Sequence, residues 1–320
     1  MRHSLNLLLE ELRESAEMPA QTSLCHLSNL DAEDAARVRD VWLRLPVELR
    51  RRLIIRMVEL AEADLEMDFD AVFHLGLEDE DAEVRTSAVK GLWEDEDIRL
   101  VPLLAARLRE DEAATVRAAA AMSLGRFVLM GELERIPPGP YALAYETLLA
   151  ACQTADEHIE VRRRGLESLA YVGNETVAGL IHEAYAAPEE KMHISAVFAM
   201  GRSADTSWAR HVRQKIFSPN PELRYEATRA CGELQLREAV SELEELADDV
   251  DSEVQEAALW ALGQVGGDRA REILEHYCLA EDEATQAAAE VAMAQLEFLH
   301  RDLSELFTKP IKETNWQENG

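Results

Sequence analysis

A 31-residue repeat constrains the fold of this chain more than any other feature. Segment 249–263 reads DVDSEVQEAALWALG, and segments 218–232 and 111–125 share its pattern: a polar turn, an aliphatic residue, and an alanine-rich run that ends at glycine. We call the aliphatic residue the anchor; anchors lie 31 residues apart from residue 161 onward, and 32 and 45 apart upstream. The anchors are Val84, Val116, Val161, Met192, Leu223 and Val254, with Thr285 in the same column. A fixed period of this length is typical of repeat proteins in which each unit packs only against its neighbours.

Each repeat is predicted to form two helices. After the anchor, apolar residues follow the 3.6-residue period of one helix face. Three positions before it stands a residue whose oxygen can accept hydrogen bonds from free backbone N–H groups, namely Asp81, Asn220, Asp251 and Asp282. First helices are expected over 98–109, 141–152, 176–186, 207–217, 237–247 and 269–278, with a degenerate pair over 32–45 and 47–61. The sequence therefore predicts an all-α fold, a right-handed α-solenoid (superhelix) of about eight helix pairs.

The repeat pattern also predicts how the chain is divided. We expect a lead helix and linker over 1–30, one repeat solenoid over 31–299, and a tail over 300–320. The spacing from Val116 to Val161 exceeds the period, and three of the ten prolines lie at 137–140 within the excess. Because clustered prolines mark loops, we expect a loop insertion near 130–140, which is either a tolerated surface insertion or a contact for a partner.

The runs of Val-Arg, alanine-rich spacing and Leu-Gly resemble the HEAT-repeat family, in the short HEAT-like form that phycobilin lyase subunits also contain. The resemblance covers residues 70–296 well and 31–62 weakly. It implies a scaffold, adaptor or regulatory subunit whose second helices line a long concave surface. It also implies an Arg–Asp ladder that ties neighbouring repeats together, carried here by Arg85, Arg117, Arg162 and Arg224 and by Asp79, Asp111, Asp156 and Asp249.

The net charge narrows the choice of partner. Lys plus Arg is 33 and Asp plus Glu is 63, which gives −30. A polyanion repels phosphate backbones and anionic lipid surfaces, so we expect neither nucleic acid nor membrane as a partner. Residues 57–84 hold eleven acids and no Lys or Arg. This stretch is either a solvated face or a patch that attracts a basic protein or peptide.

The compartment follows from the N-terminus and the cysteines. The chain starts MRHSLNLLLEE, which lacks the apolar stretch of a signal peptide, and no run approaches 18 apolar residues. Its four cysteines are widely and irregularly spaced, unlike a disulfide framework. We therefore expect a cytoplasmic protein with free thiols.

No catalytic constellation stands out in the sequence. His182-Glu183 is the one pair of the His-Glu type by which HEAT-like di-iron hydroxylases hold their metal, and the next helix has His193-Ile194, which lacks the carboxylate. We therefore expect no enzymatic activity, no cofactor and no metal site. The predicted function is a scaffold or adaptor that binds a partner on its concave face. The alternatives are a lyase-like protein that binds a tetrapyrrole or another small ligand, and a self-assembling rod.

A partner-binding surface is predicted on the side of the second helices opposite their apolar arc. At about 100° per residue, positions two and six residues after the anchor face away from the core. Large side chains at exposed positions favour a binding role, since Tyr, Trp and Arg often dominate binding energy. The alternative is that superhelical curvature buries them against the next repeat. The predicted partner-binding residues are Ile194, Phe198, Arg202, Tyr225, Arg229 and Trp260.

Overall fold

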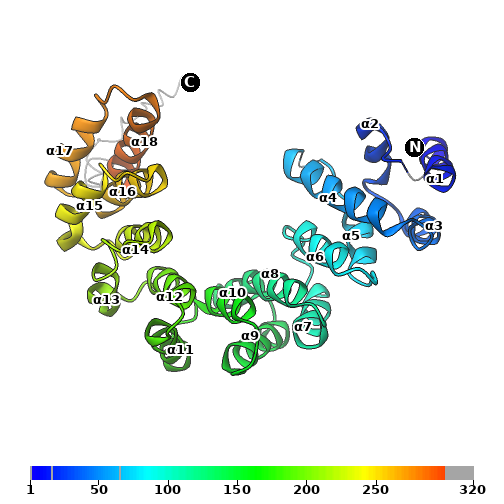
Figure 1. Cartoon of the computed structure of the whole chain (residues 1–320), viewed down its shortest axis with the longest axis horizontal. Coiled ribbons are helices and arrows are strands. Elements are labelled where there is room, and N and C mark those ends of the chain that lie inside the picture. Colours follow the sequence, from blue (N-terminus) through cyan, green and yellow to red (C-terminus); the bar gives the residue numbers. More distant parts are fainter. Residues whose placement is uncertain (1, 16, 65, 300–320) are drawn as a thin grey trace, which may run out of the picture. The chain divides into compact units, whose positions relative to one another are not determined.

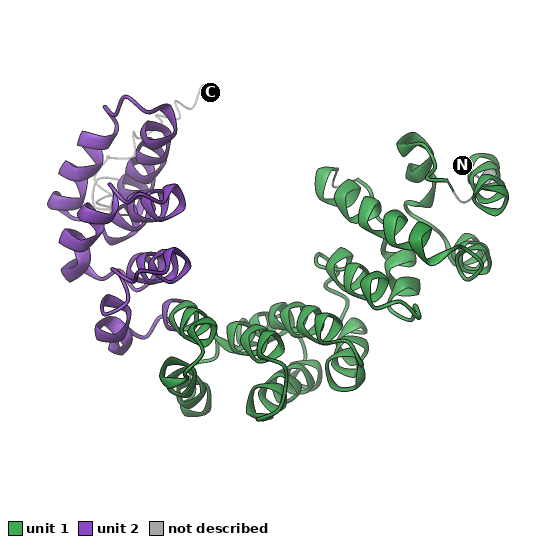
Figure 2. Cartoon of the chain, in the orientation of Figure 1, with its two compact units in different colours: residues 1–199 green, residues 200–320 purple. Residues whose placement is uncertain are grey.

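The computed structural model of the chain describes residues 2–15, 17–64 and 66–299. The chain falls into two compact units that divide between Ala199 and Met200 (Figure 2). Across the described ranges every regular element is a helix, so the predicted all-α solenoid of helix pairs is confirmed. The predicted tail, 300–320, lies outside the described residues, and the boundaries expected near residues 30 and 299 stay predictions.

Unit 1 starts with a lead helix and continues with helix pairs. Its helices are α1 (Arg2–Glu14), α2 (Gln21–Leu24), η1 (Cys25–Leu27), α3 (Ala32–Trp42), α4 (Val47–Ala63), α5 (Asp70–Gly76), α6 (Ala82–Gly91), α7 (Leu100–Glu110), α8 (Ala114–Glu132), α9 (Pro138–Gln153), α10 (Ile159–Leu169) and α11 (Glu175–Ala186). Helix α12 (Glu190–Arg202) contains the boundary between the units.

Unit 2 continues the same alternation of first and second helices. Its elements after α12 are η2 (Thr206–Trp208), α13 (Ala209–Arg213), α14 (Pro221–Glu233), η3 (Arg237–Ala239), α15 (Val240–Leu246), α16 (Ser252–Val265), α17 (Asp268–Tyr277) and α18 (Glu283–Leu299). The first helices expected at 207–217 and 237–247 are each divided into a 3-10 turn and a short α-helix.

Within each unit the helices form two rows (Figure 1). In unit 1 the second helices α4, α6, α8 and α10 stack on one another, and in unit 2 α14, α16 and α18 do the same. We call these the second-helix rows. Each second helix also packs against the first helix of its pair, as α8 does against α7 and α16 against α15. The anchors Val84, Val116, Val161 and Val254 have no exposed surface, as the repeat pattern predicts.

The four predicted capping residues all act as helix caps. Asp81 accepts hydrogen bonds from the backbone N–H groups of Glu83 and Val84, and Asp251 caps α16 in the same way. Asn220 accepts from the N–H of Glu222, and Asp282 accepts from the N–H of Thr285. Every second helix whose start was predicted this way therefore begins where the polar side chain satisfies its free N–H groups.

The extra residues between Val116 and Val161 lengthen two helices rather than forming a long loop. Helix α8 has 19 residues and α9 has 16, and residues 133–137 alone separate them. The expectation of a loop over 130–140 is therefore wrong in extent. Pro138 and Pro140 lie in the first turn of α9, where a proline loses nothing because the N–H groups there have no helical partner.

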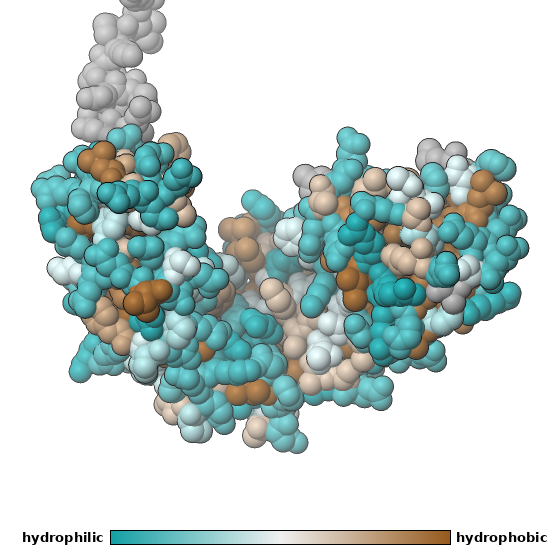
Figure 3. Space-filling view, turned by 45° about the horizontal axis from the view of Figure 1, so that its top comes forward, coloured by the Kyte–Doolittle hydropathy of each residue, from teal (hydrophilic) through white to brown (hydrophobic). Residues whose placement is uncertain are grey.

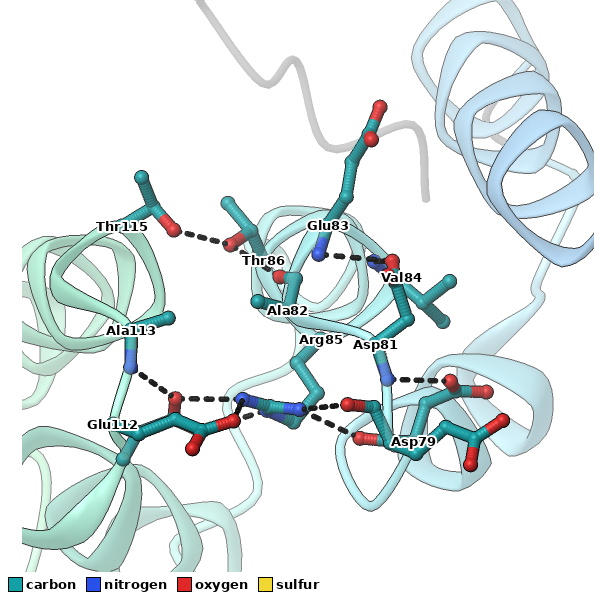
Figure 4. A network of polar contacts seen from close by, with 12 residues as sticks. Asp79, Asp81, Ala82, Glu83, Val84, Arg85, Thr86, Glu112, Ala113 and Thr115 are labelled. Atoms are coloured by element: carbon teal, nitrogen blue, oxygen red, sulfur yellow. Dashed lines mark hydrogen bonds and ion pairs between the residues drawn. The ribbon is translucent and has the colours of Figure 1, made fainter. Parts of the chain in front are cut away.

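Arg85 shows how neighbouring repeats are joined (Figure 4). Its Nε and Nη2 donate to the two carboxylate oxygens of Asp111 in the next repeat, both at 2.8 Å. Its Nη1 donates to the backbone carbonyls of Asp79 and Glu80, in the turn before its own helix. The Asp111 side chain is 1% exposed. Burial alone would raise the pKa of Asp111. The hydrogen bonds and charge of Arg85, the backbone N–H of Ala113 and the charge of Arg107 together outweigh burial, so the pKa is lowered.

The ladder has further members in both units. Arg224 makes the same bidentate pair with Asp249, at 2.9 and 2.8 Å, and donates to the carbonyl of Ser218. Arg50 reaches Asp79 at 3.2 Å, so the pattern extends one repeat upstream of the quoted arginines. Arg117 keeps the geometry with a different acid: it pairs with Glu157 at 3.1 and 2.7 Å, not with the predicted Asp156.

The ladder is interrupted at Arg162. The repeat position that carries Asp111 and Asp249 is occupied by Ala187 in the next repeat. The Nε of Arg162 is buried and makes no hydrogen bond, so Arg162 does not take the ladder role expected for it. His193, at the Arg position of that repeat, contacts the carbonyl oxygen of Ala187 at 2.6 Å instead.

The acidic stretch 57–84 is partly neutralised within the protein. Six of its eleven acids form ion pairs with arginines of α3 and α4, namely Glu59, Glu78, Asp79, Glu80, Asp81 and Glu83 with Arg39, Arg50, Arg51 and Arg56. The sequence alone suggested solvent or a partner as the neighbour of these carboxylates, and not arginines upstream in the chain.

The face of the molecule seen in Figure 3 is predominantly hydrophilic, with apolar side chains in small groups.

Candidate partner-binding site

A hollow of about 420 Å³ lies between α14 and α16 in the second-helix row of unit 2. Two of its side chains come from α14, one helical turn apart, and four from α16. We call it the unit 2 hollow, and it is lined by Tyr225, Arg229, Glu253, Glu256, Ala257 and Trp260. Four of these residues occupy the positions two and six residues after an anchor: Tyr225, Arg229, Glu256 and Trp260. They lie close together because adjacent second helices place the same repeat positions side by side.

A cation–π contact forms the wall of the unit 2 hollow. The guanidinium carbon of Arg229 lies 4.4 Å from the ring centroid of Trp260 and 5.9 Å from that of Tyr225. Such contacts bind a cation to the negative face of an aromatic ring. Together the three side chains form a surface that is both aromatic and polar.

Behind this wall, one buried carboxylate holds two arginines. Glu233 lies 2.8 Å from Arg202 and 3.5 Å from Arg229, and its side chain is 14% exposed. Burial raises the pKa of Glu233, and the two guanidinium groups offset part of that rise. Arg229 is therefore fixed from two sides, by the Glu233 carboxylate and by the Trp260 ring.

Two glycines leave room for this arrangement. A Cβ atom at Gly232 would lie 2.7 Å from the Cζ3 atom of Trp260, and one at Gly201 would lie 2.6 Å from a carboxylate oxygen of Glu233. Both distances are too short for real atoms, so a side chain at either position would displace Trp260 or Glu233. The small residues that end each alanine-rich run thus set the position of the wall.

Unit 1 has an equivalent hollow in its own second-helix row. It spans α6, α8 and α10 and measures about 660 Å³. Its lining is mostly alanine and threonine, with Met122 as its largest exposed apolar side chain at 65% exposure. We call it the unit 1 hollow, and it is lined by Thr86, Lys90, Ala113, Ala114, Thr115, Ala118, Ala119, Met122, His158, Glu160 and Arg164.

The six predicted binding residues have different environments. Tyr225, Arg229 and Trp260 line the unit 2 hollow, and Arg202 reaches its wall through Glu233. Phe198 is partly buried and lines none of the hollows described above.

Ile194 is 4% exposed, so the expectation that it faces a partner is wrong. Its helix α12 is buried beyond its core face: Ser195, Ala196 and Val197 have no exposed surface, and Ser195 receives a hydrogen bond from Arg163 of α10. The single apolar arc drawn from the sequence did not allow for flanks that pack against neighbouring second helices.

Sequence reasoning missed three acids of the site. Glu253 and Glu256 are exposed residues on α16 that line the unit 2 hollow, and Glu233 lies behind it. Glu233 follows Arg229 by four residues, and this spacing places two side chains on the same helix face. The spacing was therefore a signal that could have linked Glu233 to Arg229.

The titratable groups elsewhere do not assemble into a second site. In the described part of the chain, no three His, Cys, Asp or Glu side chains are placed to hold a metal ion. Burial raises the pKa of the Cys152 and Cys231 thiols to about 12, so these thiols are protonated and unreactive near neutral pH. No helix among the described residues is long and apolar enough to cross a membrane.

The stacked helix pairs of both units define a helical repeat protein of the α-solenoid class. A family model described as HEAT repeats matches residues 70–138 in unit 1 and 209–294 in unit 2. Each unit therefore contains a segment that matches HEAT repeats, and the resemblance drawn from the Val-Arg and Leu-Gly runs is confirmed. No curated protein sequence matches the chain.

Solved structures of helical proteins align with the chain at low sequence identity. Importin beta, crystallised in an ammonium sulfate condition, aligns with a TM-score of 0.50 at 11% identity, over 92% of this chain and 47% of that chain. The complex of CpcE and CpcF of phycocyanin lyase from Nostoc sp. PCC7120 aligns with a TM-score of 0.43 at 18% identity, over 62% of this chain and 77% of that chain. Human deoxyhypusine hydroxylase in complex with glycerol gives 0.32 at 15% identity, over 92% and 96%.

Proposed function

We propose that this protein is a non-enzymatic scaffold or adaptor that binds a protein or peptide partner on the second-helix row of unit 2. The observation that carries the proposal is the unit 2 hollow, in which Arg229 lies 4.4 Å over Trp260 and beside Tyr225. Tyr, Trp and Arg are the residue types that most often dominate the energy of protein interfaces.

The rigidity of the hollow supports the same proposal. Arg224 and Asp249 join α14 to α16 by two hydrogen bonds of 2.9 and 2.8 Å, and Glu233 holds Arg229 from behind. A surface that is ordered before binding loses less conformational entropy when a partner arrives. The hollow therefore has both the residue types and the preorganisation of a binding site.

The test is capture of partners from the cells that make the protein, with mass spectrometry to identify them. The full chain is compared with the double variant Tyr225→Ala/Trp260→Ala and with a control, Lys90→Ala/Met122→Ala. The control residues take the position six after the anchor in unit 1 and line the unit 1 hollow. We expect the first variant to lose the captured partner, with affinity for the purified partner reduced by about thirtyfold, the value of a typical hot-spot residue.

The folding of each variant is measured in parallel by its denaturant midpoint. Because Trp260 packs against Gly232, Arg229→Gln serves as a second variant; it leaves Glu233 paired with Arg202. Loss of capture by a folded variant of Tyr225, Arg229 or Trp260 supports the proposal. Full capture by all of these variants contradicts it, and loss in the control alone moves the site to unit 1.

A further inference from the structure

We infer that the unit 2 hollow recognises a basic side chain, so that the partner segment it binds carries exposed arginine or lysine. This inference rests on the proposed function, because it names the chemistry of the guest at the same site. It is carried by the distribution of charge around the hollow and by its aromatic faces.

The fixed charges favour a cation. Arg202 and Arg229 share the single carboxylate of Glu233, which leaves one positive charge behind the wall. Glu253 and Glu256 supply two negative charges at the lining, and both are exposed. The hollow therefore has a net negative charge, on a chain whose total is −30, and charge complementarity selects a basic guest.

An acidic guest would have to compete for the one guanidinium in the lining of the hollow, that of Arg229. The guanidinium of Arg229 already lies between the Glu233 carboxylate and the Trp260 ring. A carboxylate that approached it would also approach Glu253 and Glu256, which line the same hollow. Like charges in the same hollow repel, so the two exposed carboxylates disfavour anions.

The aromatic residues of the hollow also favour a cationic guest. Trp260 already binds one guanidinium, that of Arg229, at 4.4 Å from its ring centroid. Tyr225 lies farther from Arg229, at 5.9 Å, and lines the same hollow. A guest arginine or lysine that enters the hollow meets aromatic surface and carboxylates together, which is the combination that binds cations in a partly desolvated site.

The unit 1 hollow offers an internal comparison. At the equivalent repeat positions it has Thr86 and Ala118 in place of Tyr225 and Glu256, and its lining includes Lys90. Its lining has no Tyr, Trp or Phe ring, and Lys90 and Arg164 outnumber its one carboxylate, Glu160, so the same guest should not bind there.

The experiment uses the full chain and an acetylated, amidated peptide of alternating glycine and arginine. Binding is measured by calorimetry against the citrulline analogue, which keeps the shape of arginine and removes its charge. The test variant is Glu253→Gln/Glu256→Gln. The matched control is Glu238→Gln/Glu245→Gln, which makes the same charge change at exposed residues of η3 and α15, in the other helix row of unit 2.

We expect the arginine peptide to bind at least about tenfold more tightly than the citrulline peptide, with a loss of about tenfold in the test variant and little change in the control. Equal losses in both charge variants would mean general attraction to a polyanion and would overturn the inference. Absence of binding by the arginine peptide would overturn it as well. If citrulline binds as well as arginine, and Trp260→Ala abolishes both, the charge preference is wrong while the hollow remains a binding site. Lysate capture that depends on the hollow tests the proposed function separately.

Discussion

The two hollows occupy the same repeat positions and yet differ in chemistry. Both lie between consecutive second helices and are lined by the residues two and six positions after the anchors. The unit 1 hollow measures about 660 Å³ and the unit 2 hollow about 420 Å³. The equivalent residues are Thr86, Lys90, Ala118 and Met122 in unit 1 and Tyr225, Arg229, Glu256 and Trp260 in unit 2.

This difference separates what the backbone does from what the side chains do. The helix-pair geometry makes a hollow in the second-helix row of each unit. In both units an Arg–Asp pair joins one second helix to the turn before the next, Arg85 with Asp111 and Arg224 with Asp249. Recognition then depends on a few exposed positions that the fold leaves free to vary.

Removing the aspartate of the Arg–Asp pair in each unit should give the largest loss of stability. Asp111→Ala removes the partner of Arg85, whose side chain is 7% exposed. Asp249→Ala removes the partner of Arg224, whose side chain is 12% exposed. Because an unpaired buried charge is costly, we expect Asp111→Ala to reduce the free energy of unfolding by about 3–5 kcal/mol. The loss for Asp249→Ala should be smaller, about 1–3 kcal/mol, since water reaches that pair more easily. Urea unfolding of both variants measures the difference, and a larger loss at Asp249 would show that exposure does not set the strength of the ladder.

Transferring the lining should transfer the binding. The fivefold change Thr86→Tyr, Lys90→Arg, Thr115→Glu, Ala118→Glu and Met122→Trp gives the unit 1 hollow the aromatic and charged residues of the unit 2 hollow. We expect the variant to bind a second arginine peptide within about tenfold of the affinity at unit 2, because the backbone positions are equivalent. Calorimetric stoichiometry checks this, with the Glu253→Gln/Glu256→Gln background isolating the new site. A stoichiometry that stays at one peptide would mean that the hollows differ in backbone as well as in side chains.

Completing the ladder should stabilise unit 1. Ala187 occupies the repeat position at which Asp111 and Asp249 pair with arginines. Ala187→Asp would offer a carboxylate to Arg162, whose Nε is buried without a hydrogen bond. We expect a gain of about 1 kcal/mol in the free energy of unfolding, as for a charge-assisted hydrogen bond offset by desolvation. Ala187→Asn, which is similar in shape but uncharged, is the control and should gain less. Equal stability of both variants and the natural chain would show that Arg162 lies out of reach.

The smallest effect concerns pH and Asp70 of unit 1. Burial, together with the charges of Asp68 and Asp95, raises its pKa from 3.8 to about 6, while His74 and Arg126 oppose the rise. An acid with a raised pKa binds its proton more tightly in the folded state, so stability rises as pH falls from 7 through 6 towards 4. Solvent screening limits this contribution to less than about 1 kcal/mol. Unfolding curves of Asp70→Asn should not show this rise in stability at lower pH. If the variant still shows it, the rise is due to other titratable groups.

The sequence predicted what depends on local periodicity. The anchors, the caps Asp81, Asn220, Asp251 and Asp282, and the alternation of first and second helices follow from residues within one repeat. These features were predictable because helix starts and apolar faces are decided over a few residues. The length of α8 was not, since the prolines that follow it are compatible with both a loop and the first turn of a helix.

The sequence was less informative about contacts between repeats. Ile194 is buried because α12 packs beyond its apolar arc, as the hydrogen bond from Arg163 of α10 to Ser195 shows, and a one-helix projection does not include such contacts. The pairing of Arg51 with Asp81, 30 residues away, and the sharing of Glu233 by Arg202 and Arg229 depend on how helices stack. At the site, repeat position identified Tyr225, Arg229 and Trp260, and the acids around them required the three-dimensional arrangement.

The contacts of Arg85 also have an evolutionary consequence. Its guanidinium binds the carbonyls of its own preceding turn and the aspartate in the turn between the two helices of the next repeat. A repeat of this kind therefore carries an arginine for one junction and an aspartate for the other. A duplicated repeat inserted beside its parent brings a matching arginine and aspartate, and both new junctions close without any further substitution. A gene for such a chain can therefore lengthen or shorten by whole repeats, and later substitutions at the exposed positions can give the added hollow a new ligand.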